Sequence, residues 1–154
     1  MPAVAIREGG LGDPQVEALL RLHHAEAHES TPAGNAHALD AVGLAASDIT
    51  FFTAWAGDAL AGMAALRTLD ATHAEVKSMR THPDHLRRGV AATLLAHLVS
   101  VAKARGITRL SLETGTAPMF AAANRLYERE GFTDCDAFGG YPSSSHNRFM
   151  MIAM

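Results

Sequence analysis

The chain has little of several features that would assign it to a class. It holds one cysteine, Cys135, among 154 residues, so neither an intramolecular disulfide nor a CxxC zinc motif can form. Charged residues make up only 19% and the net charge is −3, which argues against a general nucleic-acid binder. No stretch approaches the ~20 apolar residues that cross a bilayer, and the N-terminal segment lacks the pattern of a signal peptide. We therefore expect a cytoplasmic protein that binds neither membrane nor nucleic acid.

What is present is enough apolar material for a core. Hydrophobic residues make up 48% of the chain, and the sequence shows no internal repeat or long low-complexity tract. A chain of this length commonly forms one domain, so we expect a single domain over residues 1–154.

Strand-like and helix-like segments follow one another in an order typical of an α+β fold. Helices and strands interleave only in the second half of the chain, which predicts a mixed sheet rather than a doubly wound parallel one. The expected elements are a strand at 3–8, a helix from 14, a short helix at about 37–44, a hairpin from 49, a strand at 74–80, a helix from 88 or 89 to 105, a strand at 108–113, a helix from 118 to 131 and two strands from 132 onward.

The run EVKSMRTHPDHLRRGVAA, residues 75–92, carries the strongest chemical signal. A strand ends, a short turn follows, and a helix begins near Gly89. The first amides of a helix have no internal partners and attract anions, and glycine allows close backbone approach. Arg87 and Arg88 add charge suited to a pyrophosphate. Such a pattern also occurs at solvated, well-capped helix ends, so by itself it leaves both interpretations open.

Two motifs resemble those of the GNAT superfamily of N-acetyltransferases. MRTHPDHLRRGVAATLL resembles the family's motif A, whose core is Q/R-x-x-G-x-G/A, except that Leu86 stands where Gln or Arg is usual. NRLYEREGF, residues 124–132, resembles the family's LYExxGF helix-to-strand motif. The resemblance implies the GNAT fold, a mixed sheet of about six or seven strands flanked by about four helices. It is closer still to a bacterial subgroup of small members, at EVKSMRT, LSLETG and GFTDCDAF and in the ending with Phe138, Tyr141 and Phe149-Met150.

The resemblance implies acetyl-CoA as co-substrate and no metal. In the family, the strand before motif A bulges away from its parallel neighbour and bonds the pantetheine arm through its backbone, here at Met79, Arg80 and Thr81. An N–H near Met79 would polarise the thioester carbonyl. The pyrophosphate would lie on the backbone amides of Arg87, Arg88, Gly89, Val90, Ala91 and Ala92.

Two side chains are the catalytic candidates. By the resemblance, Tyr127 lies near the cofactor sulfur and acts as the acid, with a buried aromatic as the alternative. Glu75 precedes Met79 by four residues, so we expect both side chains on one face of the strand and Glu75 as the base or holder of a relay water. The alternative for Glu75 is a structural salt bridge with Lys77.

The expected reaction is direct transfer of acetyl from acetyl-CoA to a primary amine of a small molecule or peptide, in a ternary complex. The alternatives are a sensor that holds acyl-CoA without turnover and an enzyme that acylates a hydroxyl group. The family resemblance is also compatible with a homodimer. An asparagine that many members use to bond the cofactor is replaced here by Phe120, and Asn124 lies on a different face of the helix.

The chain has nine histidines, which raises the question of a metal site, but their spacing does not favour one. His24 and His28 are four residues apart, but the glutamate between them is misplaced for an HExxH motif. His23 and His37 flank the loop that lines the acceptor site in many GNAT enzymes, and could contact substrate or simply be surface or core residues.

Overall fold

The computed structural model describes residues 4–30 and 41–154. The helices and strands follow the predicted order. Part of the helix expected at about 37–44 lies outside the described residues, and the helix expected from 118 to 131 is a 3-10 turn followed by an α-helix. The elements are β1 (Ala5–Glu8), α1 (Pro14–Ser30), α2 (Ala41–Leu44), β2 (Ile49–Ala56), β3 (Ala59–Thr68), β4 (His73–Thr81), η1 (Pro83–His85), α3 (Val90–Ala104), β5 (Arg109–Gly115), η2 (Pro118–Phe120), α4 (Ala121–Arg129), β6 (Thr133–Asp134) and β7 (Asn147–Ala153).

The strands form one sheet in the order β1-β2-β3-β4-β5-β7-β6. Every neighbouring pair is antiparallel except β4 and β5, which are parallel because α3 connects them across the sheet. Over the described part of the chain the sheet has seven strands and the α-helices number four. The predicted α+β fold with a mixed sheet is therefore confirmed.

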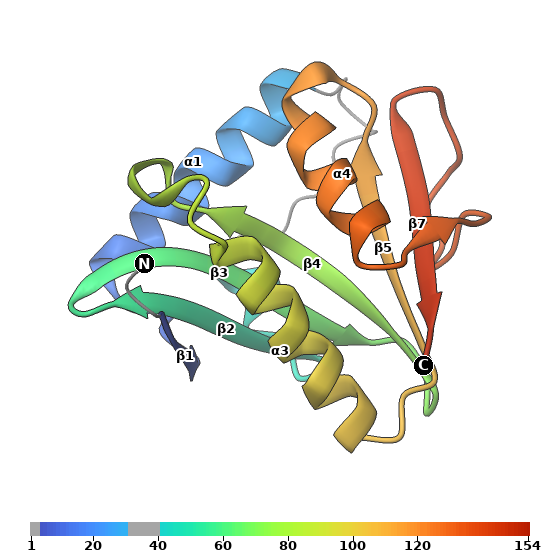
Figure 1. Cartoon of the computed structure of the whole chain (residues 1–154), viewed down its shortest axis with the longest axis horizontal. Coiled ribbons are helices and arrows are strands. Elements are labelled where there is room, and N and C mark those ends of the chain that lie inside the picture. Colours follow the sequence, from blue (N-terminus) through green and yellow to red (C-terminus); the bar gives the residue numbers. More distant parts are fainter. Residues whose placement is uncertain (1–3, 31–40) are drawn as a thin grey trace.

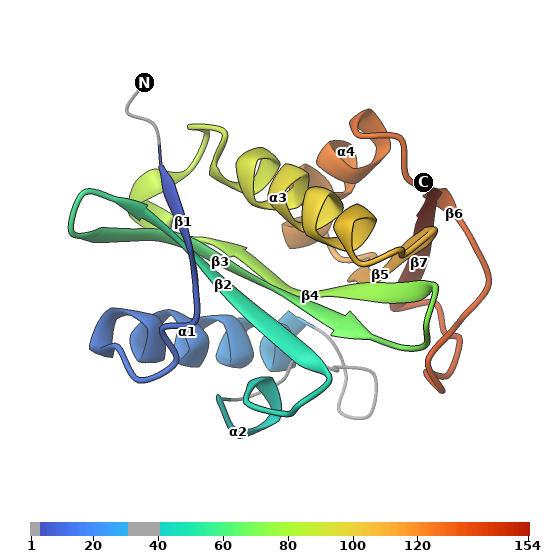
Figure 2. The same ribbon diagram turned by 90° about the horizontal axis from the view of Figure 1, so that it is seen from below.

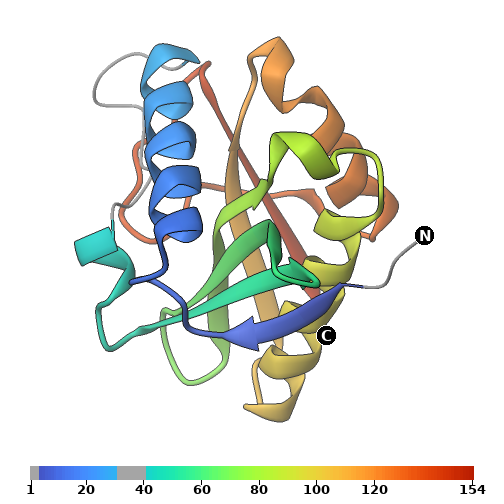
Figure 3. The same cartoon turned by 90° about the vertical axis from the view of Figure 1, so that its left-hand side faces the viewer.

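Helices cover both faces of this sheet. Figure 2 shows α3 and α4 on one face and α1 with α2 on the other, and Figure 3 shows the sheet between α1 and the α3–α4 layer. Both β2 and β3 contribute side chains to two separate cores. Phe52 of β2 belongs to the core that includes α3 and α4 residues, while its neighbour Phe51 belongs to the core that includes α1 and α2 residues. We call these two sides the α3 face and the α1 face.

The parallel pair β4–β5 separates along its length. Hydrogen-bonded pairing runs only from His73–Arg109 to Val76–Leu112, although both strands continue beyond it. Figure 1 shows β4 and β5 close together at one end and wide apart at the other. The two strands therefore form a V whose open end lies near the start of α3.

A bulge in β4 accompanies this separation. Pairing with β3 runs through Ala65–Lys77, skips, and resumes at Met63–Arg80, so Ser78 and Met79 together oppose Ala64. Ser78 has a φ of 53°, an unusual value for a residue with a side chain. An extra residue reverses the alternation of side chains beyond it. The splayed, bulged strand expected from the family resemblance is present.

Candidate functional site

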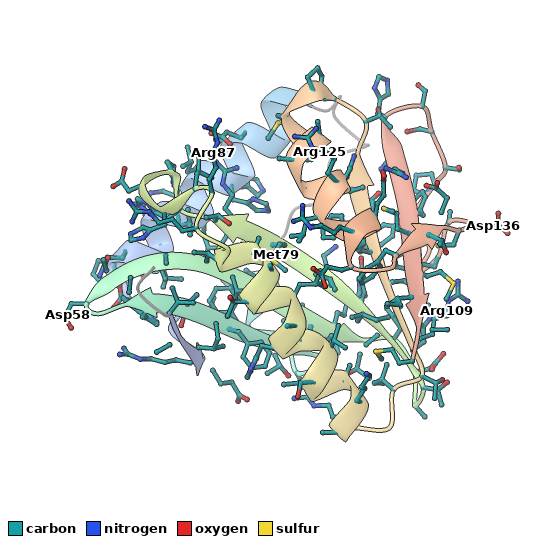
Figure 4. All side chains as sticks on the ribbon, in the orientation of Figure 1. Asp58, Met79, Arg87, Arg109, Arg125 and Asp136 are labelled. Carbon is teal, nitrogen blue, oxygen red and sulfur yellow. The ribbon has the colours of Figure 1, made fainter. Side chains whose placement is uncertain are left out.

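The open V leaves strand edges that no other strand pairs. From Lys77 to Thr81, β4 lacks a partner on its β5 side, and residues 113–115 of β5 pair only with β7. Met79 packs against the core of the α3 face, and Figure 4 shows it in the opening between α3 and α4. Backbone groups of Met79 and Thr81 are thus placed where an extended ligand could bond them as an added strand would.

The start of α3 lies at the open end of the V. Gly89 caps the helix with a φ of 77°, and a Cβ built on it would meet no atom within 4 Å. The amides of Val90, Ala91 and Ala92 begin the helix and have no partner four residues earlier, whereas Thr93 N–H donates to the Gly89 carbonyl. Free amides facing open space at a helix N-terminus form an anion-binding geometry.

Two arginines border these amides. Arg87 and Arg88 are exposed, and within residues 4–30 and 41–154 neither forms an ion pair. Arg87 has a φ of 63°, so the turn before the helix is held in a left-handed conformation that favours glycine. Figure 4 shows Arg87 on the loop that leads into α3. We call residues 87–92 the cradle; the exposed Leu86, where the family has Gln or Arg, precedes it.

Tyr127 lies on α4 and packs in the core of the α3 face. Its side chain is 6% exposed, and its ring lies 5.9 Å from that of Phe132. Burial raises the pKa of Tyr127 to about 12, so the phenol keeps its proton at neutral pH. A protonated phenol is a hydrogen-bond donor, so the Tyr127 hydroxyl can donate to a ligand that comes within reach.

Phe120 and Asn124 both contact the last residues of β5. Thr114 Oγ1 donates to Asn124 Oδ1 at 2.8 Å, and Asn124 Nδ2 donates to the Gly115 carbonyl at 3.1 Å. A Cβ on Gly115 would overlap the Phe120 ring, so only glycine lets this aromatic pack there. The Asn124 side-chain amide therefore joins α4 to β5, a role that the sequence did not predict.

Glu75 points to the α1 face. Its neighbours Ala74 and Val76 lie in the core of the α3 face, and Met79 packs against that same core. The prediction that Glu75 and Met79 share a face is therefore wrong, because the bulge at Ser78 reverses the alternation between them. Glu75 is 1% exposed, so it cannot meet a solvent-side ligand without movement or a relay.

The Glu75 carboxylate belongs to a buried cluster on the α1 face. Lys77 Nζ lies 3.5 Å from Oε2, which confirms the salt bridge that was the alternative for Glu75. Arg67 Nη1 lies 3.8 Å from Oε1, and the Tyr141 hydroxyl donates to Oε1 at 3.2 Å. Burial raises the pKa of Glu75, against the lowering effects of Lys77, Tyr141 and Arg67. We call Arg67, Glu75, Lys77 and Tyr141 the Glu75 cluster.

Tyr141 is the member that sequence reasoning missed as a site residue. It follows β6 by seven residues in a segment without helix or strand, and nothing in its local spacing connects it to Glu75. Its appearance in the subgroup's aromatic ending was the one available signal. Burial, and then the Glu75 carboxylate, raise the pKa of Tyr141.

His23 and Arg80 lie at the edge of the α1 face. The side chain of Arg80 forms an ion pair with Glu26 of α1, so the cofactor role expected for Arg80 is left to its backbone. Burial, with Arg80 nearby, lowers the pKa of His23 to about 4, so the imidazole is neutral at pH 7. Its Nδ1 is buried without a hydrogen-bond partner in the described structure.

The structure describes only some of the other histidines that the sequence singled out. His37 and the side chain of His28 fall outside what the structure describes. Within the described residues, no group of three or more His, Cys, Asp or Glu side chains could hold a metal ion. Nor is any helix there long and apolar enough to cross a membrane.

Comparisons with known proteins agree with this geometry. The model of the acetyltransferase (GNAT) family matches residues 16–132. Escherichia coli K12 has an uncharacterized N-acetyltransferase, YedL, 43% identical over 97% of this chain and 94% of that protein. Bacillus subtilis 168 has an uncharacterized N-acetyltransferase, YsnE, 44% identical over 88% of this chain and 90% of that protein. A GNAT family acetyltransferase from Elizabethkingia anophelis, solved with acetyl-CoA bound, shares the fold with a TM-score of 0.74 at 16% identity over all of both chains.

Proposed function

Since the chain belongs to the acetyltransferase (GNAT) family, we propose that it transfers an acetyl group from acetyl-CoA to a primary amine of a small molecule or peptide. The observation that carries this proposal is the V between β4 and β5 with the cradle at its open end. Strand edges without partners suit an extended amide-containing arm, and free helix amides beside two arginines suit a pyrophosphate. Acetyl-CoA carries both groups in that order along its length.

The proposed reaction is direct attack within a ternary complex. The neutral amine nitrogen bonds to the thioester carbonyl carbon and then loses its second proton to water. The carbon–sulfur bond breaks, and CoA leaves as a thiolate that takes a proton from solvent. A backbone N–H near Met79 stabilises the oxyanion that forms meanwhile. An alkylamine is mostly protonated near pH 7, since its pKa is about 10, so a base must remove a proton before attack.

We assign the base to Glu75. Its raised pKa makes it a better proton acceptor than an ordinary glutamate, while Lys77 and Arg67 favour its charged form. Because the side chain is 1% exposed, the proton reaches it through a relay water rather than by direct contact with the acceptor.

We assign the stabilisation of the leaving sulfur to Tyr127. A thiol has a pKa of about 8.5, well below the value of about 12 that burial gives Tyr127. Full transfer of the phenol proton to the thiolate is therefore uphill. A hydrogen bond from the hydroxyl to the departing sulfur is the contribution that this pKa allows.

A panel of acceptors with acetyl-CoA tests the proposal. Amines, polyamines, amino acids, aminoglycoside-type antibiotics and alcohols are each incubated with the protein, thiol release is followed, and the acceptor is checked by mass for one added acetyl group. Acetylation of an amine is the expected result. Acetylation of alcohols alone would move the chain to a hydroxyl acyltransferase, and tight acetyl-CoA binding without turnover on any acceptor would make it a sensor.

A further inference from the structure

The hydroxyl of Tyr141 bonds both members of the Lys77–Glu75 ion pair. Lys77 Nζ donates to the Tyr141 oxygen at 2.6 Å, while it stays 3.5 Å from Glu75 Oε2. The same hydroxyl donates to Glu75 Oε1 at 3.2 Å. The strongest hydrogen bond of the ammonium therefore goes to the phenol and not to the carboxylate.

This arrangement leaves one carboxylate oxygen without a hydrogen bond from the part of the chain that the structure describes, although the Lys77 ammonium lies 3.5 Å from it. Glu75 Oε2 is buried and has no hydrogen-bond partner among the described residues. A buried acceptor without a donor costs free energy, so the fold must hold it in that state by other contacts. An oxygen in this condition is ready to accept a proton.

Among the residues that the structure describes, several elements near Glu75 contribute a titratable or charged group. Arg67 comes from β3, Lys77 and His73 from β4, Glu113 from β5, and Tyr141 from the segment before β7. His73 bonds Ser111 at 2.7 Å, and Glu113 receives a hydrogen bond from Asn147, so neither replaces Tyr141 at the Glu75 carboxylate. Tyr141 is the neutral member of the set within the Glu75 cluster.

The position of the Tyr141 hydroxyl is set by packing rather than by the cluster. Its ring stacks on Phe149 at 6.4 Å and meets Phe138 edge-on at 5.9 Å, and its N–H donates to the Phe138 carbonyl at 3.1 Å. The Lys77 ammonium also lies 4.9 Å from the centre of the ring. These contacts would remain if the hydroxyl alone were removed.

We propose that Tyr141 is a positioning residue that draws the Lys77 ammonium away from Glu75 and so keeps Oε2 open to receive the proton of the acceptor amine. The idea rests on the proposed function. Without the hydroxyl, Lys77 turns the short remaining distance to Oε2 and caps it with a charge-assisted hydrogen bond, which makes Glu75 a weaker base.

Tyr141→Phe is the first test, read by titration of the Glu75 carboxyl. Carbon-13 NMR of glutamate-labelled protein gives that titration without turnover, with the Glu75 signal assigned by its loss in Glu75→Gln. Loss of the Tyr141 hydrogen bond alone would raise the pKa of Glu75. We expect the closer Lys77 ammonium to outweigh that loss, so that the pKa of Glu75 falls in Tyr141→Phe and kcat for the best amine of the panel falls about tenfold. An unchanged or raised pKa would overturn the proposal.

A fall in pKa has a second explanation, namely that a loosened segment lets water reach Glu75. Lys77→Met, made in both the wild-type and the Tyr141→Phe background, separates the two. Removing the ammonium raises the pKa of Glu75 in both backgrounds, because Lys77 lowers it already in the wild type. If Lys77 caps Oε2 in Tyr141→Phe, the rise is larger in that background; if water has entered instead, the rise is no larger than in the wild type, and the proposal fails.

Thr116→Val is the matched control for the segment. Thr116 Oγ1 donates to the Ser145 carbonyl at the other end of the same loop, at 2.7 Å, and Thr116 is not among the groups that act on Glu75. We expect it to leave the Glu75 titration unchanged, and a shift equal to that of Tyr141→Phe would also overturn the proposal. The NMR readout does not need an acceptor, so absence of acetyl transfer in the wild type would defeat the proposed function alone.

Discussion

The two faces of the sheet at the V are built in different ways. On the α3 face, the cradle is a run of consecutive residues, it is mostly backbone, and it lies open to solvent. On the α1 face, the Glu75 cluster takes side chains from β3, β4 and a distant segment, and its carboxylate is 1% exposed. Under the proposed function, the cofactor is held mainly by backbone groups, whereas proton transfer from the acceptor amine depends on side chains that the whole fold places.

Glu75→Gln is the change that most sharply tests the α1 face. The amide keeps the shape and cannot take a proton, so we expect kcat to fall about 10²-fold. Glu75 acts as the carboxylate, so wild-type activity should fall as pH drops through its raised pKa, at higher pH than for an ordinary glutamate. A pH profile of kcat for both proteins checks this; a variant with the wild-type acidic limb would make Glu75 purely structural.

Tyr127→Phe asks whether the α3 face also contributes a catalytic side chain. The ring and its contact with Phe132 remain, and only the hydroxyl is lost. We expect kcat to fall by about tenfold to a hundredfold, with acetyl-CoA affinity and Tm little changed. Steady-state kinetics beside thermal melts give the answer. Normal turnover per folded molecule of Tyr127→Phe would mean that the α3 face contributes only to binding.

Gly89→Val should damage the cradle without reaching the Glu75 cluster. A side chain would fill the open space beside the helix amides, so we expect acetyl-CoA to bind about tenfold more weakly, roughly 1.4 kcal/mol. Calorimetric titration measures this directly.

The matched control is Gly106→Val, at the other end of α3. Gly106 also has a positive φ, 80°, so valine strains the backbone there as well, but far from the cradle. Equal loss of affinity in the two variants would mean that strain, and not the filled cradle, weakens binding.

Asn124→Ala carries the smallest expected effect. It removes two partly buried hydrogen bonds that join α4 to β5, so we expect the free energy of unfolding to fall by about 1 kcal/mol and Tm by a few degrees. Acetyl-CoA affinity should stay near that of the wild type. Thermal melts with and without acetyl-CoA distinguish this anchor from a cofactor contact, which would weaken binding as well.

The sequence predictions were right for the cradle, which neighbouring residues build, and incomplete for the Glu75 cluster, which distant residues build. The start of α3 near Gly89 was predictable because capping, helix periodicity and glycine conformation act over a few neighbouring residues. The face of Glu75 was predicted wrongly relative to Met79, because a single bulge at Ser78 reverses alternation and leaves no local signature. Tyr141 was missed because 66 residues separate it from Glu75 along the chain.

The sequence by itself determined the family, the order of the elements and the location of the cradle, since each depends on short-range patterns of residue type. The tertiary structure alone decided which face Glu75 occupies, that the Tyr141 hydroxyl bonds both Glu75 and Lys77, and that Asn124 bonds β5. These contacts arise where strand register and loop packing bring distant residues together. Local propensities carry no information about them, because a shift of one residue in a strand moves a side chain to the opposite face.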